Sequence, residues 1–573
     1  MLPTKLLFSL LPLLASPAAG LVSPADYTIK VGALGPWGSP DDTPAYSYID
    51  KDGSYWWQSG HALYGANDPR KWTFASGQTM DDAKTNTLVS NYVNPSNPLD
   101  SNKDTTWRCN NSPTGQIASV VNGSSYSQKN FCDIAGLWVD PDTGDWIGLV
   151  HNEFTGRPYG DGLHFDGIDL AISSDQGKTW NIRERIITSP YKTVRGDTEA
   201  FPQQTYIYGD GDPRLLADPA SGYFYVWYGS RVVDKGGSWV AFYAHVARAP
   251  MSGKLSAGSW QKYYNGTWSQ PGLGGKESNL VPVSASNSKG YTPPEKEYNP
   301  ANPGKTAAQI AAGLTPPTSP LFVMDVSYNA YLGLWIGEPQ NPDQSGNAPQ
   351  EIYATDNLET QQWVKIGDTG SYTTASWYRW FLDSVTATSS AIVGKDFRAY
   401  CSFGCSGGRS SEYVNLAIES TKPASLIDTK KQYRIEADGA VLGMRGGKGA
   451  SQAKWKFAPT GDGAYIIQNQ SGALGVKSSG DGASTRAWGT HVTALQPNAS
   501  DPAFHWWVIK NADGNSFRII NRYSGLALAL SLPSSDTSTD LAETVPVRSW
   551  TAPAGGVGNG RKAASQVLNV HPV

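Results

Sequence analysis

One pattern of hydrophobic and polar positions recurs along the first three quarters of the chain. It consists of an apolar strand, an aspartate, a short turn and an aromatic strand. The turns contain Asp-Pro, Asp-Gly or Ser-Gly, which favour tight hairpins between β-rich segments. The pattern occurs at residues 45–60, 135–151, 213–229 and 321–337, with a degenerate fifth copy at 378–394.

A second pattern follows each of the first four copies. It is a short strand that turns through polar residues and ends on a tryptophan, at 63–72, 171–180, 246–260 and 353–363. Each unit therefore predicts two hairpins, or four strands. Five units of four antiparallel strands predict an all-β protein whose residues 25–425 form a five-bladed β-propeller.

The segment AISSDQGKTW (171–180) has the pattern Ser-x-Asp-x-Gly-x-Thr-Trp. It resembles the Asp-box of sialidases and other propeller proteins. The resemblance implies a turn between the third and fourth strands of a blade. Asp175 then accepts bonds from turn amides, Gly177 takes the left-handed conformation and Trp180 packs between blades. We expect this motif to be structural and not to bind a ligand.

The pattern changes after a linker-like segment at 420–431. Beyond it, Ile, Asn, Ser-Gly and Ala-Leu recur in the same order around 467–474 and 519–528. This resembles ricin-type β-trefoil lectin repeats and implies a β-trefoil over residues 430–573 that serves as a carbohydrate-binding module. Asn521, Tyr523 and Trp550 are its candidate sugar-binding residues, with packing in the barrel or loops as the alternative.

The N-terminus and the cysteines indicate export. Residues 1–20 have one lysine, a short apolar run and small residues at the end, as in a secretory signal peptide. The favoured disulfides are Cys109–Cys132 and Cys401–Cys405, although four cysteines allow three pairings. A zinc site is the weaker alternative, because no histidine pair has ligand spacing nearby. Glycosylation sequons stand at Asn110, Asn122, Asn265, Asn469 and Asn498.

Charge narrows the class of partner. The net charge is -4 and 17% of residues are charged, without a long basic run. This argues against nucleic acid or an anionic membrane as the partner. No segment after the signal is long and apolar enough to span a bilayer. We expect a secreted, extracellular monomer whose partner is a polysaccharide or glycan.

Propeller geometry separates the acidic residues into two groups. In each blade the innermost strand begins at the funnel face, so the first hairpin turn and the Asp-box turn lie on the opposite face. Turn acids on that opposite face are expected to be structural: Asp50, Asp140, Asp175, Asp218 and Asp356. Candidates for chemistry are acids at the starts of inner strands and in funnel-side loops.

Three inner strands begin in acidic segments, SPDDTPAY (39–46), NFCDIAGLW (130–138) and YGDGDPRLL (208–216). Acids from three successive blades at one funnel resemble the five-bladed propeller glycoside hydrolases of the arabinanase/xylosidase and invertase groups. The resemblance implies Asp42 as base or nucleophile, Asp133 as the residue that tunes the pKa, and Glu153 or Glu199 as general acid. Asp212 lies like the aspartate of an invertase-group motif.

Other side chains are predicted to line the funnel and bind substrate: Arg231, Trp239, Glu338, Trp377 and Arg379. The segment 260–279 is polar and Gly-rich, and we interpret it as a loop at the funnel rim. No cofactor is expected. A structural Ca²⁺ is left open, although no EF-hand-like loop is present.

The leading hypothesis is therefore a secreted O-glycosyl hydrolase that acts on a polysaccharide or glycan. Such chemistry needs one protonated and one ionised carboxyl, which crowding in a poorly solvated funnel provides. The alternatives are a non-catalytic glycan-binding lectin and a propeller polysaccharide lyase that would use His164, His245, Tyr378 and Arg379. The sugar, the linkage and the stereochemical outcome stay open.

Overall fold

The fold is taken from a computed structural model. It describes residues 22–40, 43–61, 70–83, 88–114, 131–154, 165–191, 199–235, 238–340, 347–375, 377–402, 404–443, 453–476, 482–531, 541–550 and 562–573. The predicted signal peptide, Asp42, Asn122 and His164 lie outside these ranges.

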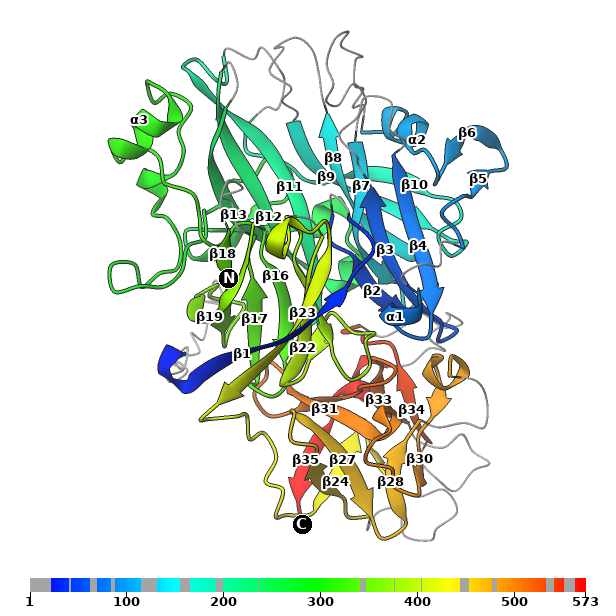
Figure 1. The fold of residues 1–573 in the computed structure, drawn as a ribbon. Helices are drawn as coiled ribbons and strands as arrows, with labels where there is room; N and C mark the ends of the chain where they lie inside the picture. The colour runs from blue at the N-terminus through cyan, green and yellow to red at the C-terminus, as the bar shows by residue number, and fades with distance from the viewer. Residues whose placement is uncertain are drawn as a thin grey trace, which may run out of the picture.

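The N-terminal region is a ring of five antiparallel sheets, and Figure 1 shows it above a smaller C-terminal β domain. This confirms the predicted all-β fold. From the inside outward, blade 1 consists of β2 (Tyr46–Ile49), β3 (Tyr55–His61) and β4 (Lys71–Gly77), and blade 2 of β7 (Phe131–Val139), β8 (Trp146–Phe154), β9 (Phe165–Ser173) and β10 (Asn181–Ile187). Blade 3 consists of β11 (Thr205–Asp218), β12 (Tyr223–Asp234), β13 (Ser238–Pro250) and β14 (Gln261–Tyr264), and blade 4 of β16 (Asp325–Asn329), β17 (Leu334–Glu338), β18 (Ala348–Thr355) and β19 (Val364–Thr374). Blade 5 consists of β20 (Trp380–Asp383), β22 (Asp396–Cys401), β23 (Glu412–Ser420) and β1 (Tyr27–Pro36).

The ring closes through its first strand. β1 pairs antiparallel with β23 as the outer strand of blade 5, from Tyr27 opposite Ser420 to Pro36 opposite Glu412. The two ends of the propeller segment therefore share one sheet, which removes an open seam between the first and last blades.

The same turn joins the first two strands of each blade. In blades 2 to 4 the N–H of a glycine donates to the carbonyl at the end of the inner strand, for example Gly144 to Asp140 at 2.7 Å and Gly222 to Asp218 at 3.1 Å. These glycines have a left-handed backbone, with φ of 76° and 74°, which costs glycine little. Ala387 takes this place in blade 5 at φ 50°.

The Asp-box prediction is confirmed. The N–H of Thr179 donates to Asp175 Oδ1 at 2.9 Å, and Gly177 has φ 80°. Trp180 is buried, stacks on Phe74 of blade 1 with centroids 5.4 Å apart, and packs edge-on against Trp72. The motif therefore fixes blade 2 to blade 1.

Both predicted disulfides are present, Cys109–Cys132 and Cys401–Cys405. Two details of the repeat prediction are wrong. Trp72, expected to end a turn before the fourth strand of blade 1, lies in β4, the third strand, and the described residues of that blade form three strands; residues 63–69 lie outside the described ranges. In the fifth copy, β20 pairs with β22, whereas β21 (Ile392–Val393) runs parallel to β16 of blade 4.

The prediction of a rim loop at 260–279 is also wrong. β14 and β15 (Thr267–Pro271) form a hairpin that extends the sheet of blade 3 outward. Tyr263 and Trp268 lie opposite each other in this hairpin, and their rings contact with centroids 5.0 Å apart. This aromatic cross-strand pair stabilises strands that the polar composition did not indicate.

The helices are short, and among the described residues none is long and apolar enough to cross a membrane. They are α1 (Met80–Ala83), α2 (Thr106–Asn110) and α3 (Thr306–Ala311). A two-stranded ribbon of β5 (Val93–Asn94) and β6 (Asn97–Ser101) lies between blades 1 and 2 in the sequence.

The C-terminal domain is the predicted β-trefoil. Its strands are β24 (Tyr433–Ala437), β25 (Ala440–Val441), β26 (Lys456–Pro459), β27 (Ala464–Asn469), β28 (Gly472–Gly475), β29 (Thr490–His491), β30 (Thr493–Leu495), β31 (His505–Lys510), β32 (Phe517–Asn521), β33 (Ala527–Ser531), β34 (Leu541–Val545) and β35 (Asn569–Pro572). The pairs β35–β24, β26–β27 and β31–β32 join the end of each repeat to the start of another. Buried Trp455, Trp506 and Ile467 belong to the shared core.

The trefoil sits against the first hairpin turns of the blades, at the end that we call the trefoil face (Figure 1). Four buried trefoil arginines each contact a different blade. They are Arg486 on the Gly53 carbonyl of blade 1, Arg548 on Pro141 of blade 2, Arg518 on Pro219 of blade 3 and Arg522 on Asp383 of blade 5. Against blade 4, Trp507 and Ile520 pack on Tyr328 and Ala330.

Candidate active site at the far face of the propeller

A group of charged side chains lies at the far face, the end of the propeller away from the trefoil. It comprises His151, Glu153, Asp166, Asp212 and Arg231, which we call the acid cluster. His151 and Glu153 stand two residues apart on β8 and therefore share one face of that strand. In the strand register Glu153 lies opposite Asp166 on β9, and β9 meets β11, the strand of Asp212, through a single parallel bridge.

The imidazole of His151 is at the centre of the acid cluster. Its Nε2 lies 3.4 Å from Asp166 Oδ2 and 3.6 Å from Glu153 Oε1, and its Nδ1 lies 3.4 Å from Asp212 Oδ1. Arg231 Nη2 donates to Asp212 Oδ2 at 2.5 Å, and Nη1 lies 3.8 Å from Asp166. All five side chains are buried.

Two cations balance the carboxylates of the acid cluster. Burial lowers the pKa of His151, but Asp212, Glu153 and Asp166 outweigh it and raise the pKa to about 10. The imidazole is therefore protonated at neutral pH. His151 and Arg231 thus place two positive charges among the three carboxyl groups of the acid cluster.

The backbone at Asp212 is irregular. The pairing of β11 with β12 shifts register on both sides of Asp210–Gly211, which marks a bulge. Asp212 itself has a left-handed backbone with φ 54°. A non-glycine residue in this region costs on the order of 1 kcal/mol, and such strain collects at functional sites. The bulge turns the Asp212 carboxylate toward His151 and Arg231.

Blade 4 adds Glu338, a carboxyl group whose surroundings favour the protonated form. Glu338, at the far end of β17, is fully buried, and neither carboxyl oxygen has a hydrogen-bond partner among the described residues. Burial raises its pKa to about 8, although Arg379 Nη1 lies 3.8 Å from Oε1. Burial likewise raises the pKa of neighbouring Asp325 to about 6. Glu338 is therefore mostly protonated at neutral pH.

Arg214 connects blades 3, 4 and 5 at this end. Its Nη2 donates to Gln340 Oε1 at 3.3 Å, and its guanidinium lies 5.3 Å from the ring centre of Tyr378. The Tyr378 N–H also donates to Gln340 Oε1. Tyr378 has φ 53°, and the β-branched Val323 beside it has φ 43°, so two more non-glycine residues hold the left-handed conformation here.

An aromatic wall borders the arginine of the acid cluster. Phe242, Phe322 and Trp377 pack together with Tyr378 and Val323. Arg231 lies 5.6 Å from the ring centre of Phe322 and 6.0 Å from that of Phe242. An apolar border with few polar groups lowers the local dielectric, and this strengthens the charge interactions inside.

The structure brings several predicted site residues together. Asp212, Glu153 and Arg231 belong to the acid cluster, and Asp133 on β7 lies opposite His151 in the strand register. Glu338 and Arg379 lie beside each other, with Oε1 3.8 Å from Nη1.

The other residues predicted for the funnel are exposed, buried in the aromatic wall or outside the described part of the structure. Glu199 is exposed in a turn before β11, and no described contact joins it to the acid cluster. Trp377 is buried in the aromatic wall, with 3% of its surface exposed, so it offers little area for a sugar. Asp42 and the side chain of Trp239 lie outside the described part of the structure, and their roles stay predictions.

Sequence reasoning missed His151, Arg214 and Asp325. A signal for His151 was available, since it shares a strand face with Glu153 and ends an aromatic strand. Arg214 stands two residues after Asp212, and Asp325 follows an apolar run within the repeat at 321–337, so neither position has a local sequence signal for chemistry.

The acid cluster does not fit the Ca²⁺ ion that the sequence left open. His151, Glu153 and Asp166 each offer one ligand atom within 4.8 Å of the others. Ca²⁺ takes six to eight oxygen ligands, whereas this set has one nitrogen and two oxygens, and the imidazole carries a proton. The imidazolium already supplies the positive charge at this point.

The trefoil candidates lie toward the protein interior. Asn521 is fully buried and its Nδ2 donates to the Ala503 carbonyl at 3.0 Å, so the prediction that it binds sugar is wrong. The Tyr523 hydroxyl donates to Gly482 O, and the Trp550 indole donates to Asp142 of blade 2 at 3.0 Å. Sugar binding by Tyr523 and Trp550 stays a prediction.

Comparisons with known proteins agree on the C-terminal domain. Residues 451–543 match the family model described as ricin-type beta-trefoil lectin domain-like. This part of the chain is therefore similar to ricin-type trefoil domains. No curated protein sequence matches the chain.

Similar solved structures include glycoside hydrolases. A family 117 glycoside hydrolase from Zobellia galactanivorans is 8% identical, covers 71% of this chain and 97% of its own, and has a TM-score of 0.34. The catalytic domain of a family 62 α-L-arabinofuranosidase from Coprinopsis cinerea is 10% identical, covers 70% of this chain and 99% of its own, and has a TM-score of 0.32. A family 32 β-fructofuranosidase from Bombyx mori is 11% identical, covers 94% of this chain and 92% of its own, and has a TM-score of 0.29. These TM-scores and identities are too low to indicate function, so the proposed function rests on the residues of the site.

Proposed function

We propose that this protein is a glycoside hydrolase whose reaction takes place at the far face of the propeller. The observation that carries the proposal is the contrast between Glu338, whose pKa burial raises to about 8, and Asp212, which accepts a bond from Arg231 and lies 3.4 Å from the His151 imidazole. Two carboxyl groups whose surroundings favour opposite protonation states are what acid–base cleavage of a glycosidic bond requires.

Glu338 would donate a proton to the leaving oxygen, because it holds one at neutral pH and lacks a described hydrogen-bond partner. Asp212 would act as the base or nucleophile, oriented by Arg231 and His151. Arg214 and Tyr378, which both donate to Gln340, would hold in place the strands that carry Asp212 and Glu338. Asp42 and Asp133 are retained from the sequence as further candidates for the base and the tuning acid.

The trefoil would bind carbohydrate and keep the propeller near its substrate. The match of residues 451–543 to a lectin-like family model supports this role. Secretion is part of the same proposal, and two disulfides support it because such bonds persist in oxidising compartments.

The test is sugar release from a panel of plant, fungal and bacterial polysaccharides. Asp212→Asn and Glu338→Gln should each fold and bind glycan, but lose at least about a hundredfold in turnover, the scale of acid–base groups. Asp396→Asn on β22 is the matched control, since its side chain is exposed on blade 5. Full activity in both site variants would refute the assignment. No release by the wild-type protein, with binding retained, would instead indicate a lectin.

A further inference from the structure

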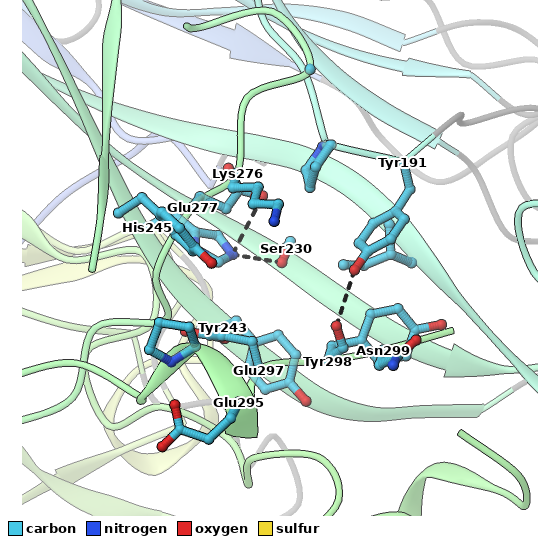
Figure 2. Close-up of a pocket in the computed structure, with 15 residues that line it drawn as sticks. Tyr191, Ser230, Tyr243, His245, Lys276, Glu277, Glu295, Glu297, Tyr298 and Asn299 are labelled. Carbon is cyan, nitrogen blue, oxygen red and sulfur yellow. Dashed lines mark hydrogen bonds and ion pairs between the residues drawn. The ribbon is translucent and has the colours of Figure 1, made fainter. Parts of the chain in front are cut away.

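A cavity of about 490 Å³ lies on blade 3, apart from the acid cluster. Figure 2 shows that Ser230 and His245 of blade 3 meet Tyr191, Lys276 and Glu297 from other segments there. Ser230 precedes Arg231 on β12, and neighbouring residues of a strand point to opposite faces of the sheet. The cavity, which we call the blade-3 pocket, is therefore on the other face from the acid cluster.

The floor of the blade-3 pocket fixes the state of one histidine. His245 Nδ1 lies 3.0 Å from the carbonyl of Ser278, which can only accept, so Nδ1 carries the proton. Burial lowers the pKa of His245 to about 4, so the ring is neutral and Nε2 is an acceptor. The Ser230 hydroxyl is 2.7 Å away and donates to Nε2.

Glu277 places a second acceptor beside this ring. Its Oε2 accepts from Lys262 Nζ at 2.5 Å and from the Tyr228 hydroxyl at 2.8 Å. Its Oε1 lies 3.9 Å from His245 Nε2, and no donor among the described residues reaches it, although only 4% of the side chain is exposed. The floor thus offers lone pairs of Glu277 Oε1 and of the Ser230 hydroxyl, whose proton is used on His245, and these oxygens can accept from donors of a ligand.

The walls and the charge balance identify the kind of donor. Rings of Tyr191, Tyr264 and Tyr298 line the pocket, and aromatic walls with a few polar groups suit a ring with hydroxyls. The charges of Lys262 and Lys276 offset those of Glu277 and Glu295, and burial raises the pKa of Glu297 to about 8, which keeps it largely neutral. Asp210 below the floor shares Lys262 with Glu277, but burial raises its pKa to about 7, so the pocket has only a small excess of negative charge to attract an ammonium ligand.

We infer that the blade-3 pocket binds a neutral sugar unit of a glycan, whose hydroxyls donate to Glu277 and to the oxygen of Ser230 while its ring packs on the tyrosines. This second site lies on the propeller itself and does not depend on the catalytic role of the far face. A glycan chain held there would be anchored independently of the trefoil.

Two lysines give a matched probe of the pocket. Lys276 lies 5.8 Å from the ring centre of Tyr264 at the pocket, and Lys289 lies 5.9 Å from the ring centre of Tyr291 outside it. Both are exposed. The full chain is acetylated with and without trisaccharides of xylose, arabinose, galactose, glucose or fructose, and with choline as a cationic probe. Mass spectrometry then gives the reaction rate at each lysine.

At least one trisaccharide should slow acetylation of Lys276 about tenfold at a concentration about ten times its dissociation constant, because occupancy limits access. Lys289 should react unchanged. Glu277→Gln and Tyr264→Ala should each remove the protection, and the second still decides if the first does not fold. Asp212→Asn should keep it, which separates this site from the catalytic one. No protection by any sugar, or protection by choline alone, would overturn the inference.

Discussion

Asp383 at the trefoil face differs from Asp212 and Glu338 at the far face in how its carboxyl oxygens are paired. At the trefoil face, Asp383 accepts two bonds from Arg522, at 2.7 and 3.1 Å, and two more from Thr386 of its own turn. Both of its oxygens are thereby satisfied. At the far face, Asp212 Oδ1 and both oxygens of Glu338 have no described hydrogen-bond partner. Buried polar groups are normally paired, so the exceptions at the far face point to a ligand or a reaction.

The backbone shows the same contrast. At the trefoil face the left-handed position of the first turn is glycine in blades 1 to 4, with Ala387 of blade 5 as the exception. At the far face Asp212, Val323 and Tyr378 take that conformation without being glycine. Strain is therefore small in the first hairpin turns, whereas around the acid cluster it is retained at three residues that are not glycine.

The largest effect should come from breaking the pair at the trefoil face. In Arg522→Met, Asp383 would stay buried without its partner, at a cost of about 3–5 kcal/mol in the free energy of unfolding. The Arg522 and Asp383 side chains are 1% and 0% exposed, so solvent screens this pair little. Urea denaturation followed by tryptophan fluorescence measures the change.

Lys422→Met is the control for this measurement. Lys422 pairs with Asp26, but its side chain is 75% exposed, and exposed pairs contribute little. The midpoint of this variant should stay close to that of the wild type. An Arg522→Met variant as stable as Lys422→Met would mean that the trefoil face is not held by this pair.

Much of the fold was predictable because its signals are local. The alternating strands, the turn residues of each first hairpin and the Asp-box all lie within about twenty residues, where turn chemistry and strand period decide the structure. Ring closure by β1 was not foreseen. β1 is exposed along much of its length, and its partner β23 lies nearly 400 residues away in the chain.

The candidate site was less predictable because burial depends on distant partners. Asp212 and Asp210 differ little as sequence positions. The bulge in β11 sends Asp212 to His151, while Asp210 pairs with Lys262 at 2.9 Å below the blade-3 pocket. Asn521 looked like a sugar ligand because the trefoil resemblance gave its position but not its depth. The state of Glu338 depends on packing that no short segment contains.

The far face should also show its unusual groups through pH. His151 has a folded pKa of about 10 against an ordinary 6.5, so its contribution to stability is full below pH 6.5 and is lost as pH rises through 10. Glu338 has a folded pKa of about 8 against 4.5, and its contribution is likewise lost as pH rises from 4.5 through 8. Both effects have the same sign.

The free energy of unfolding should therefore fall between about pH 6 and pH 10, as measured by urea denaturation at several pH values. Glu338→Gln should flatten the part of this slope below pH 8, while Asp396→Asn should not change it. Turnover should decrease on the same alkaline side, since a deprotonated Glu338 cannot donate. A stability that rises over this range would contradict the assigned protonation states.

The smallest effect is expected where the chain is cut between the two domains. Lys430 and Lys431 are exposed in the segment between β23 and β24, whereas Ile427 just before them is buried in the trefoil core. Limited trypsin digestion should cleave at these lysines, as exposed connections allow. The two fragments should still elute together in gel filtration and keep their turnover, because four buried arginines and the packing of Trp507 hold the trefoil to the blades.

In Arg522→Met the cleaved fragments should separate more readily. Fragments that part at once in the wild-type protein would show that the covalent linker, and not the trefoil face, keeps the domains together.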